Sequence, residues 1–197
     1  MINKELNIVE EMSTFGINVP SKKVEINIPN ANEWFWFTLD KLLDSWGVKS
    51  VHCTQYEPII QWLNGNKGKG LVLMGGVGLG KTIISRFVIP YIFNKCIGKS
   101  VAFYSMAQIR TLQDVKGVLE NKIIVLDDLG VEEVVNEYGN KIDVFSLIID
   151  EVEKENKLLI ATTNLNRELL LKRYKDRAYD RLMSNCKVVG IEAQSLR

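Results

Sequence analysis

The amino-acid sequence predicts an α/β protein whose parallel sheet is covered by helices on both faces. Two observations lead to this fold class. From residue 71 onward, short apolar runs of strand length alternate with longer stretches of helical periodicity. Strands that alternate with helices in this way form parallel sheets, because each helix carries the chain back to the start of the next strand. The second observation is a glycine-rich loop between the first of these strands and the first helix.

The elements of this fold can be placed along the chain from its apolar runs. Apolar runs of strand length lie at residues 71–74, 101–104, 123–126, 158–161 and 187–191. Helical spacing lies at residues 81–96, interrupted late by Pro90, and at 106–120, 141–155 and 167–183, the last forming one helix or two. We therefore expect one domain at residues 52–197, preceded by a separate segment at residues 1–51.

Composition sets the general class of protein. The chain has 197 residues, of which 46% are hydrophobic and 25% charged, as in ordinary globular proteins. A net charge of +1 argues against binding nucleic acid through bulk charge alone, but leaves room for a local patch. No stretch approaches the roughly 20 apolar residues that cross a bilayer, and the 3 cysteines favour a reducing compartment. We expect a cytoplasmic protein without a membrane partner.

The segment at residues 1–51 carries two patterns. Val24, Ile26 and Ile28 alternate with polar residues, which favours a short strand or an extended arm. An aromatic run follows at residues 34–37. This run either packs the segment onto the rest of the protein or forms a patch for a partner, since exposed apolar clusters mark interaction sites.

The glycine-rich loop is a complete phosphate-binding motif. It matches G-x-x-x-x-G-K-[ST] and reads Gly75-Gly76-Val77-Gly78-Leu79-Gly80-Lys81-Thr82. The glycines let backbone N–H groups approach phosphate oxygens, and the positive end of the following helix adds to the attraction. Lys81 is expected to reach the β- and γ-phosphates of ATP, and the Thr82 hydroxyl to bind Mg²⁺. The sequence therefore predicts a P-loop ATPase with ATP and Mg²⁺ as its cofactors.

Polar residues follow two of the other predicted strands. Asp127 and Asp128 end the strand at 123–126, and we assign Asp127 to Mg²⁺ and Asp128 to the attacking water. Asn164 follows the strand at 158–161, where it can hydrogen-bond that water or the γ-phosphate. Solvated acids at a strand end and a turn-forming asparagine are the structural alternatives.

Two groups of basic residues lie near the end of the chain. Arg177 and Arg181 are one helical turn apart and share a helix face. One or both can act as an arginine finger on the ATP of a neighbouring subunit. The alternative is a solvated basic face, with Arg181 paired to Asp180 or Asp176. Lys172, Arg173 and Lys175 are the candidates for a DNA-binding patch, with a solvated helix face as the alternative.

Together these motifs resemble the DnaC/IstB-type ATPases, a branch of the AAA+ superfamily. The matching pieces are Gly-Leu-Val-Leu-Met-Gly-Gly-Val-Gly-Leu-Gly-Lys-Thr, Ile-Ile-Val-Leu-Asp-Asp-Leu-Gly, Ala-Thr-Thr-Asn-Leu and Arg-Ala-Tyr-Asp-Arg-Leu, within residues 52–197. The resemblance implies a three-layer AAA+ (ASCE) sandwich of five parallel strands, with the strand before Asn164 between those before Gly75 and Asp127. It also implies that Arg181 is the finger, with Arg177 as the second candidate.

The resemblance further implies partners and a role. It points to a DnaC-type helicase loader that acts on a replicative helicase or on DNA, expected as single strands, and works as an ATP-dependent homo-oligomer. The alternatives are an IstB-type transposition helper, whose partner is a transposase, and a slowly hydrolysing ATP-dependent switch. The switch is favoured by Asp128, where many AAA+ enzymes have the longer Glu. Because the chain stops at Arg197, we expect no C-terminal lid domain.

Overall fold

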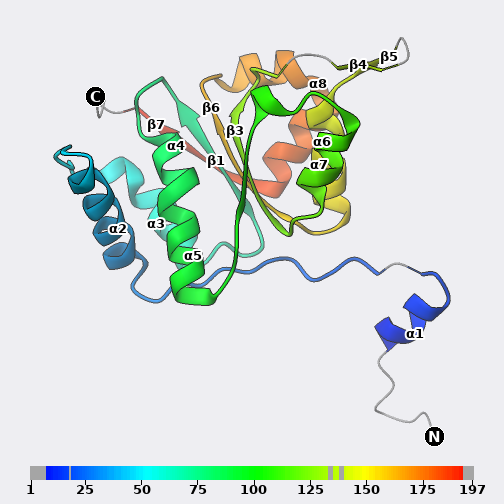
Figure 1. Cartoon of the computed structure of the whole chain (residues 1–197), viewed down its shortest axis with the longest axis horizontal. Helices are drawn as coiled ribbons and strands as arrows, with labels where there is room; N and C mark the ends of the chain where they lie inside the picture. The colour runs from blue at the N-terminus through cyan, green and yellow to red at the C-terminus, as the bar shows by residue number, and fades with distance from the viewer. Residues whose placement is uncertain (1–7, 18, 133–134, 138–139, 193–197) are drawn as a thin grey trace, which may run out of the picture.

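The computed structural model describes residues 8–17, 19–132, 135–137 and 140–192. Its centre is a parallel sheet of 5 strands in the order β2-β3-β6-β1-β7 (Figure 1). The strands are β1 (Gly70–Gly75), β2 (Ala102–Ser105), β3 (Ile123–Leu129), β6 (Leu158–Thr163) and β7 (Cys186–Ile191). The predicted fold class is confirmed, and so is the predicted place of β6, which pairs with β1 on one side and β3 on the other.

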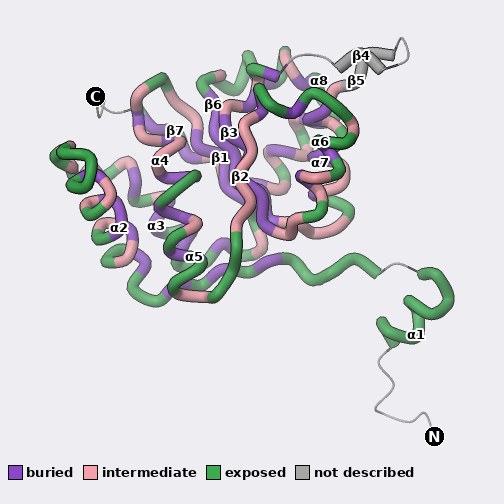
Figure 2. The backbone as a smooth tube through the Cα atoms, in the orientation of Figure 1, coloured by how far each residue is buried: buried purple, intermediate pink, exposed green. Residues whose placement is uncertain are grey.

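Helices cover both faces of this sheet (Figure 1). One face carries α2 (Ala31–Ser45), α3 (Glu57–Asn64), α4 (Lys81–Ile83) and α5 (Ile89–Ile97), and the other carries α6 (Leu112–Leu119), α7 (Val144–Lys154) and α8 (Arg167–Asn185). Successive residues of a strand point to opposite faces. Leu71 and Leu73 of β1 accordingly pack with the first group, and Val72 between them packs with the second. Figure 2 shows the resulting buried centre.

The N-terminal part of the chain packs against the first face. Val24, Ile26 and Ile28 are buried in an extended segment, as the alternation predicts, but they join no sheet. The segment is held instead by hydrogen bonds to Leu63 and Asn66. Ile28 N donates to Leu63 O at 2.9 Å, Ile26 N donates to Asn66 Oδ1 at 2.8 Å, and Asn66 donates to Ile26 O and Val24 O. The preceding helix α1 (Ile8–Thr14) has no buried residue and lies apart from the body (Figure 2).

Three predicted helices differ in detail from the observed ones. The helix after the phosphate loop continues through Pro90, because the turn before it widens into a π-helical stretch, Ile84–Val88, which relieves the clash of the proline ring with the preceding turn. The predicted helix at 106–120 becomes a short 3-10 turn, Met106–Gln108, followed by α6. Thr111 caps the start of α6: its hydroxyl accepts from Asp114 N, and the Asp114 carboxylate accepts from Thr111 N.

The remaining differences lie near α7 and α8. Asp143 caps α7, so this helix begins later than the apolar spacing suggests. A small antiparallel hairpin, β4 (Val135–Glu137) with β5 (Asn140–Ile142), precedes it and was not expected from the sequence. Helix α8 bends at Lys175, whose φ of 57° is left-handed, so the expectation of one helix or two is met by two helical halves in one element.

Candidate functional site

The phosphate loop joins the end of β1 to the start of α4, where the motif predicts it. Gly78 and Gly80 have φ values of 84° and 76°, a left-handed backbone that glycine adopts without strain. Gly75 is needed for another reason, since a Cβ there would lie 2.2 Å from the backbone oxygen of Ile191 in β7. The Tyr56 hydroxyl donates to Leu79 O of the loop at 3.3 Å. Burial raises the pKa of Tyr56 to about 12. The loop is thus held at several points.

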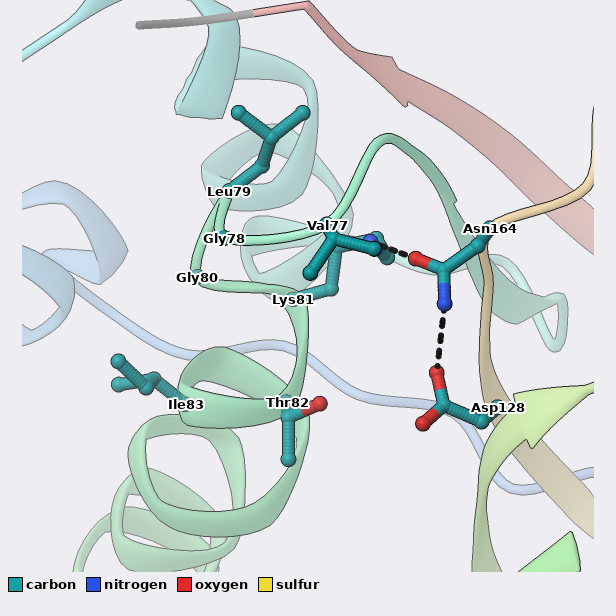
Figure 3. Close-up of a pocket in the computed structure, with 9 residues that line it drawn as sticks. All are labelled: Val77, Gly78, Leu79, Gly80, Lys81, Thr82, Ile83, Asp128 and Asn164. Atoms are coloured by element: carbon teal, nitrogen blue, oxygen red, sulfur yellow. Dashed lines mark hydrogen bonds between the residues drawn. The ribbon is translucent and has the colours of Figure 1, made fainter. Parts of the chain in front are cut away.

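The Lys81 side chain lies inside this loop and is only 5% exposed. Its Nζ donates to Gly75 O at 2.9 Å, to Gly76 O at 2.7 Å and to Asn164 Oδ1 at 2.8 Å (Figure 3). Burial lowers the pKa of Lys81, and the negative charges of Asp128 and Asp127 oppose that shift. The ammonium group therefore uses all three donors and faces two carboxylates.

Asp127 is joined to the first turn of α4. The Thr82 hydroxyl lies 3.0 Å from Asp127 Oδ1 and 3.2 Å from Oδ2, and the Thr162 hydroxyl lies 2.6 Å from Oδ1. Asp127 is 7% exposed. A carboxylate and a hydroxyl side by side are oxygen ligands of the kind that Mg²⁺ prefers. The donor set therefore fits the predicted metal.

Asp128 is turned into the pocket by a break in the pairing of β3 with β6. The register of the two strands shifts between Leu126 and Leu129, and Asp128 has a φ of 60°. Such bulges redirect side chains next to active sites. Asn164 Nδ2 donates to Asp128 Oδ1 at 3.2 Å (Figure 3). Burial and then the Asp127 charge raise the pKa of Asp128, while Lys81 and the Asn164 hydrogen bond lower it.

These elements enclose one pocket of about 220 Å³. Residues 77–83 line one side, and Asp128 and Asn164 line the other (Figure 3). Asn164 bridges the two sides, since its amide accepts from Lys81 and donates to Asp128. The structure thus brings together the phosphate loop, both acids and Asn164, although their chemical roles stay predictions.

The two predicted finger arginines do not line this pocket. Arg177 Nη2 lies 3.0 Å from Asp150 Oδ2, and its side chain is 76% exposed. Arg181 pairs through Nη1 with the other oxygen of Asp150 and through Nε with Glu153 Oε2, at 2.7 Å. The acidic partners lie on α7, and not at the nearby Asp176 or Asp180 that the sequence suggested. Within one chain, both arginines therefore stand on the surface formed by α7 and α8.

One member of the expected DNA-binding patch is otherwise engaged. Arg173 Nη2 donates to Glu132 O at 2.6 Å and lies 3.3 Å from Glu132 Oε1, and the Glu132 side chain is almost fully buried. Arg173 thus neutralises a buried acid instead of projecting into solvent. Lys172 and Lys175 are exposed and stay candidates for the patch.

Sequence reasoning gave no role to Thr162, the buried residue that touches both acids. Its hydroxyl accepts from Asp128 N at 2.9 Å in addition to its contact with Asp127. The only available signal was a hydroxyl residue inside an otherwise apolar strand, two positions before Asn164. Most buried hydroxyl groups have a hydrogen-bond partner, so a threonine in a buried strand indicates a polar contact.

The comparisons with known proteins bear on the fold. Neither a protein-family model nor a curated protein sequence matches this chain significantly. Among solved structures, the DnaC helicase loader is 19% identical, with a TM-score of 0.59, and the match covers 80% of this chain and 98% of that one. DnaI is 21% identical, with a TM-score of 0.51 and coverages of 66% and 73%. AMPPCP-bound DnaA from Aquifex aeolicus is 17% identical, with a TM-score of 0.54 and coverages of 74% and 49%.

These likenesses show that the chain has the P-loop fold of AAA+ proteins. The resemblance to DnaC-type proteins that the motifs indicate is thus confirmed at the level of the fold. Across the part of the chain that the structure describes, no helix is both long enough and apolar enough to span a membrane.

Proposed function

We propose that this chain binds Mg-ATP in the pocket of the phosphate loop and hydrolyses it. The observation that carries this proposal is the connected set of contacts from Lys81 through Asn164 to Asp128, beside the contact of Thr82 with Asp127. Lys81, Thr82, Asp128 and Asn164 line one pocket together with the glycine-rich loop, and the buried Asp127 contacts the hydroxyl of Thr82. The solved structure of DnaA bound to AMPPCP, an ATP analogue, has the same fold and adds support.

Each side chain has a role that follows from its place. Lys81 places a positive charge inside the loop, where phosphate oxygens are its natural partners. Thr82 and Asp127 are the residues that would hold Mg²⁺, which supplies positive charge to the phosphate oxygens when bound. Asp128 orients the attacking water through its carboxylate, and Asn164 fixes that carboxylate through its amide N–H.

The wider role we propose is that of a DnaC-type helicase loader. It would act on a replicative helicase or on single-stranded DNA, as an ATP-dependent oligomer in which Arg181 or Arg177 reaches the ATP of the next subunit. The fold of the DnaC helicase loader, which matches over 98% of that chain, supports this role. The exposure of Arg177 supports a contact between subunits, since this side chain is free to leave Asp150.

The test of this role is steady-state ATP turnover with and without single-stranded DNA, together with co-purification from the source cell. A loader should hydrolyse ATP measurably and retain a helicase, and a transposition helper should retain a transposase instead. Turnover that is absent under all conditions, with ATP binding intact, would identify the slow switch. The shorter Asp128 is the observation that favours this second candidate.

A further inference from the structure

A second hollow lies beside the helical stretch that follows α4, and its lining does not include the phosphate loop. It has a volume of about 600 Å³ between α2 and the stretch from Arg86 to Tyr91. Phe37 and Leu42 line it from α2, and Phe87 and Tyr91 line it from the other helix. Phe37 is 52% exposed, and Phe87 and Tyr91 are also exposed. Large apolar side chains gathered at a hollow mark an interaction surface. We call this hollow the α2–α5 groove.

The charged residues that line the α2–α5 groove are both basic. Lys41 and Arg86 are among its lining residues, and the Lys95 ammonium lies 5.9 Å from the centre of the Tyr91 ring. The Arg86 guanidinium lies 5.3 Å from the centre of the Phe87 ring and 4.7 Å from the centre of the Phe103 ring. No acidic residue lines the groove, and none of the three cations forms an ion pair among the described residues. The groove therefore suits an apolar helix that carries acids.

Helix α1 of this same chain has an apolar side and carries acidic residues. Ile8 and Met12 in α1 and Phe15 in the turn that follows it are spaced at i, i+4 and i+7, so they form one apolar stripe, and Phe15 is 71% exposed. Glu10 and Glu11 are its charged residues, and no lysine or arginine lies in it. The helix ends at Thr14, and Gly16 in the following turn has a left-handed φ of 74°, which lets Ile17 N donate to Met12 O at 2.9 Å.

Helix α1 and the α2–α5 groove of the same chain lie on different sides of the molecule (Figure 1). The hydrogen bonds of Ile26 and Ile28 to the α3 region fix the segment that follows α1. We call α1 with the turn after it, residues 8–17, the arm. Figure 1 shows α1 apart from the body on one side, with α2 and α5 on the other. An apolar helix and a matching groove on different sides of one molecule join copies in a head-to-tail manner.

We propose that the α2–α5 groove binds helix α1 of a second copy of this chain. The apolar stripe of Ile8, Met12 and Phe15 covers Phe37, Phe87 and Tyr91. Glu10 and Glu11 lie among the cations Lys41, Arg86 and Lys95. Neither partner surface includes the phosphate loop, so the contact needs no nucleotide and goes beyond the function proposed above.

The test is sedimentation velocity of the full chain without nucleotide, over a range of concentrations. The wild type should associate, with a mean mass that rises with concentration. An arm variant, Met12→Asp with Phe15→Asp, and a groove variant, Lys41→Glu with Arg86→Glu, should each stay monomeric. The charge reversal Lys116→Glu on α6 is the matched control and should associate like the wild type. All changed residues are exposed or half-exposed, so unchanged melting temperatures will show that the variants fold.

Mixing the two variants gives the sharpest outcome. The arm variant keeps an intact groove and the groove variant an intact arm, so the mixture can form a single junction. We expect a 1:1 complex that grows no further at higher concentration. A wild type that stays monomeric throughout would overturn the proposal, because the arm or the groove would then serve its own chain or another protein. Variants that associate as strongly as the wild type would overturn it too.

Discussion

The hydroxyl of Thr162 lies 2.6 Å from Oδ1 of Asp127, and both residues are buried. The Thr162 hydroxyl oxygen also accepts the backbone N–H of Asp128 at 2.9 Å. A hydroxyl has one proton and two lone pairs, so it can donate to the first acid while it accepts from the second. One side chain of β6 therefore sets the position of both acids at the end of β3.

We predict that Thr162→Val weakens the site and the fold together. Valine has nearly the shape of threonine, but it leaves Asp128 N–H and one oxygen of Asp127 without this partner. An unmet buried polar group costs about 1–3 kcal/mol of stability. Urea denaturation measures this loss, and titration with Mg-ATP measures the affinity. Thr162→Ser keeps the hydroxyl and should keep the affinity. Equal affinities for the valine variant and the wild type would show that the contact does not position Asp127.

The two acids should separate binding from hydrolysis. Asp127→Asn should weaken the Mg²⁺-dependent part of ATP binding, because its carboxylate is the one that contacts Thr82. Asp128→Asn should bind Mg-ATP normally and lose turnover, because its carboxylate faces the pocket and Asn164. Affinity with and without Mg²⁺ and steady-state turnover are the measurements. Reversed phenotypes would mean that the two roles are exchanged.

Most of the fold and the phosphate site could be predicted from local sequence signals. The phosphate loop needs glycine at fixed positions, and both acids and Asn164 follow apolar runs whose length favours buried strands. Contacts that depend on packing between distant segments could not be predicted. Arg173 with Glu132 and Arg181 with Glu153 join residues far apart in sequence, and their spacing gave no sign of the pairing.

The sequence left two interpretations of the aromatic run at residues 34–37, packing onto the rest of the protein or forming a patch for a partner. The run lies within α2, so its side chains point in different directions around one helix. Phe35 is fully buried among the core residues, while Phe37 lines the exposed α2–α5 groove. Within this run, some side chains are thus buried and others are exposed. Which of them is buried depends on how the helix is oriented on the sheet.

The raised pKa of Asp128 should be visible in stability. Its ordinary pKa is about 3.9, and burial beside Asp127 raises the folded value despite Lys81. Just above the ordinary value, the folded state therefore holds a proton that the unfolded state has released. Stability must then fall as pH rises through this window. We predict that the free energy of unfolding of the wild type, relative to Asp128→Asn, decreases there. Denaturation midpoints across this window will measure it, and a flat or rising difference would contradict the shift.

The arginines on α8 should act between subunits if either is a finger. Removing such a finger costs roughly 10³–10⁵ in kcat. Mixing Lys81→Ala with Arg181→Ala chains should restore turnover, since an intact pocket then meets an intact arginine. The same mixture with Arg177→Ala tells which arginine serves, and Lys116→Ala on α6 is the control. Turnover proportional to protein concentration, with both arginine variants active, would exclude a finger on this helix.

The central claim is that the phosphate loop binds Mg-ATP, and thermal denaturation of the wild type and Lys81→Ala with added Mg-ATP tests it most directly. A ligand at a hundred times its Kd stabilises the folded state by about 2.7 kcal/mol, and each kcal/mol raises Tm by roughly 2–4 °C for a chain of this size. We predict a rise of this order for the wild type and little or none for Lys81→Ala, whose Tm without nucleotide shows that it folds. A wild-type Tm that does not move with millimolar Mg-ATP would contradict the account.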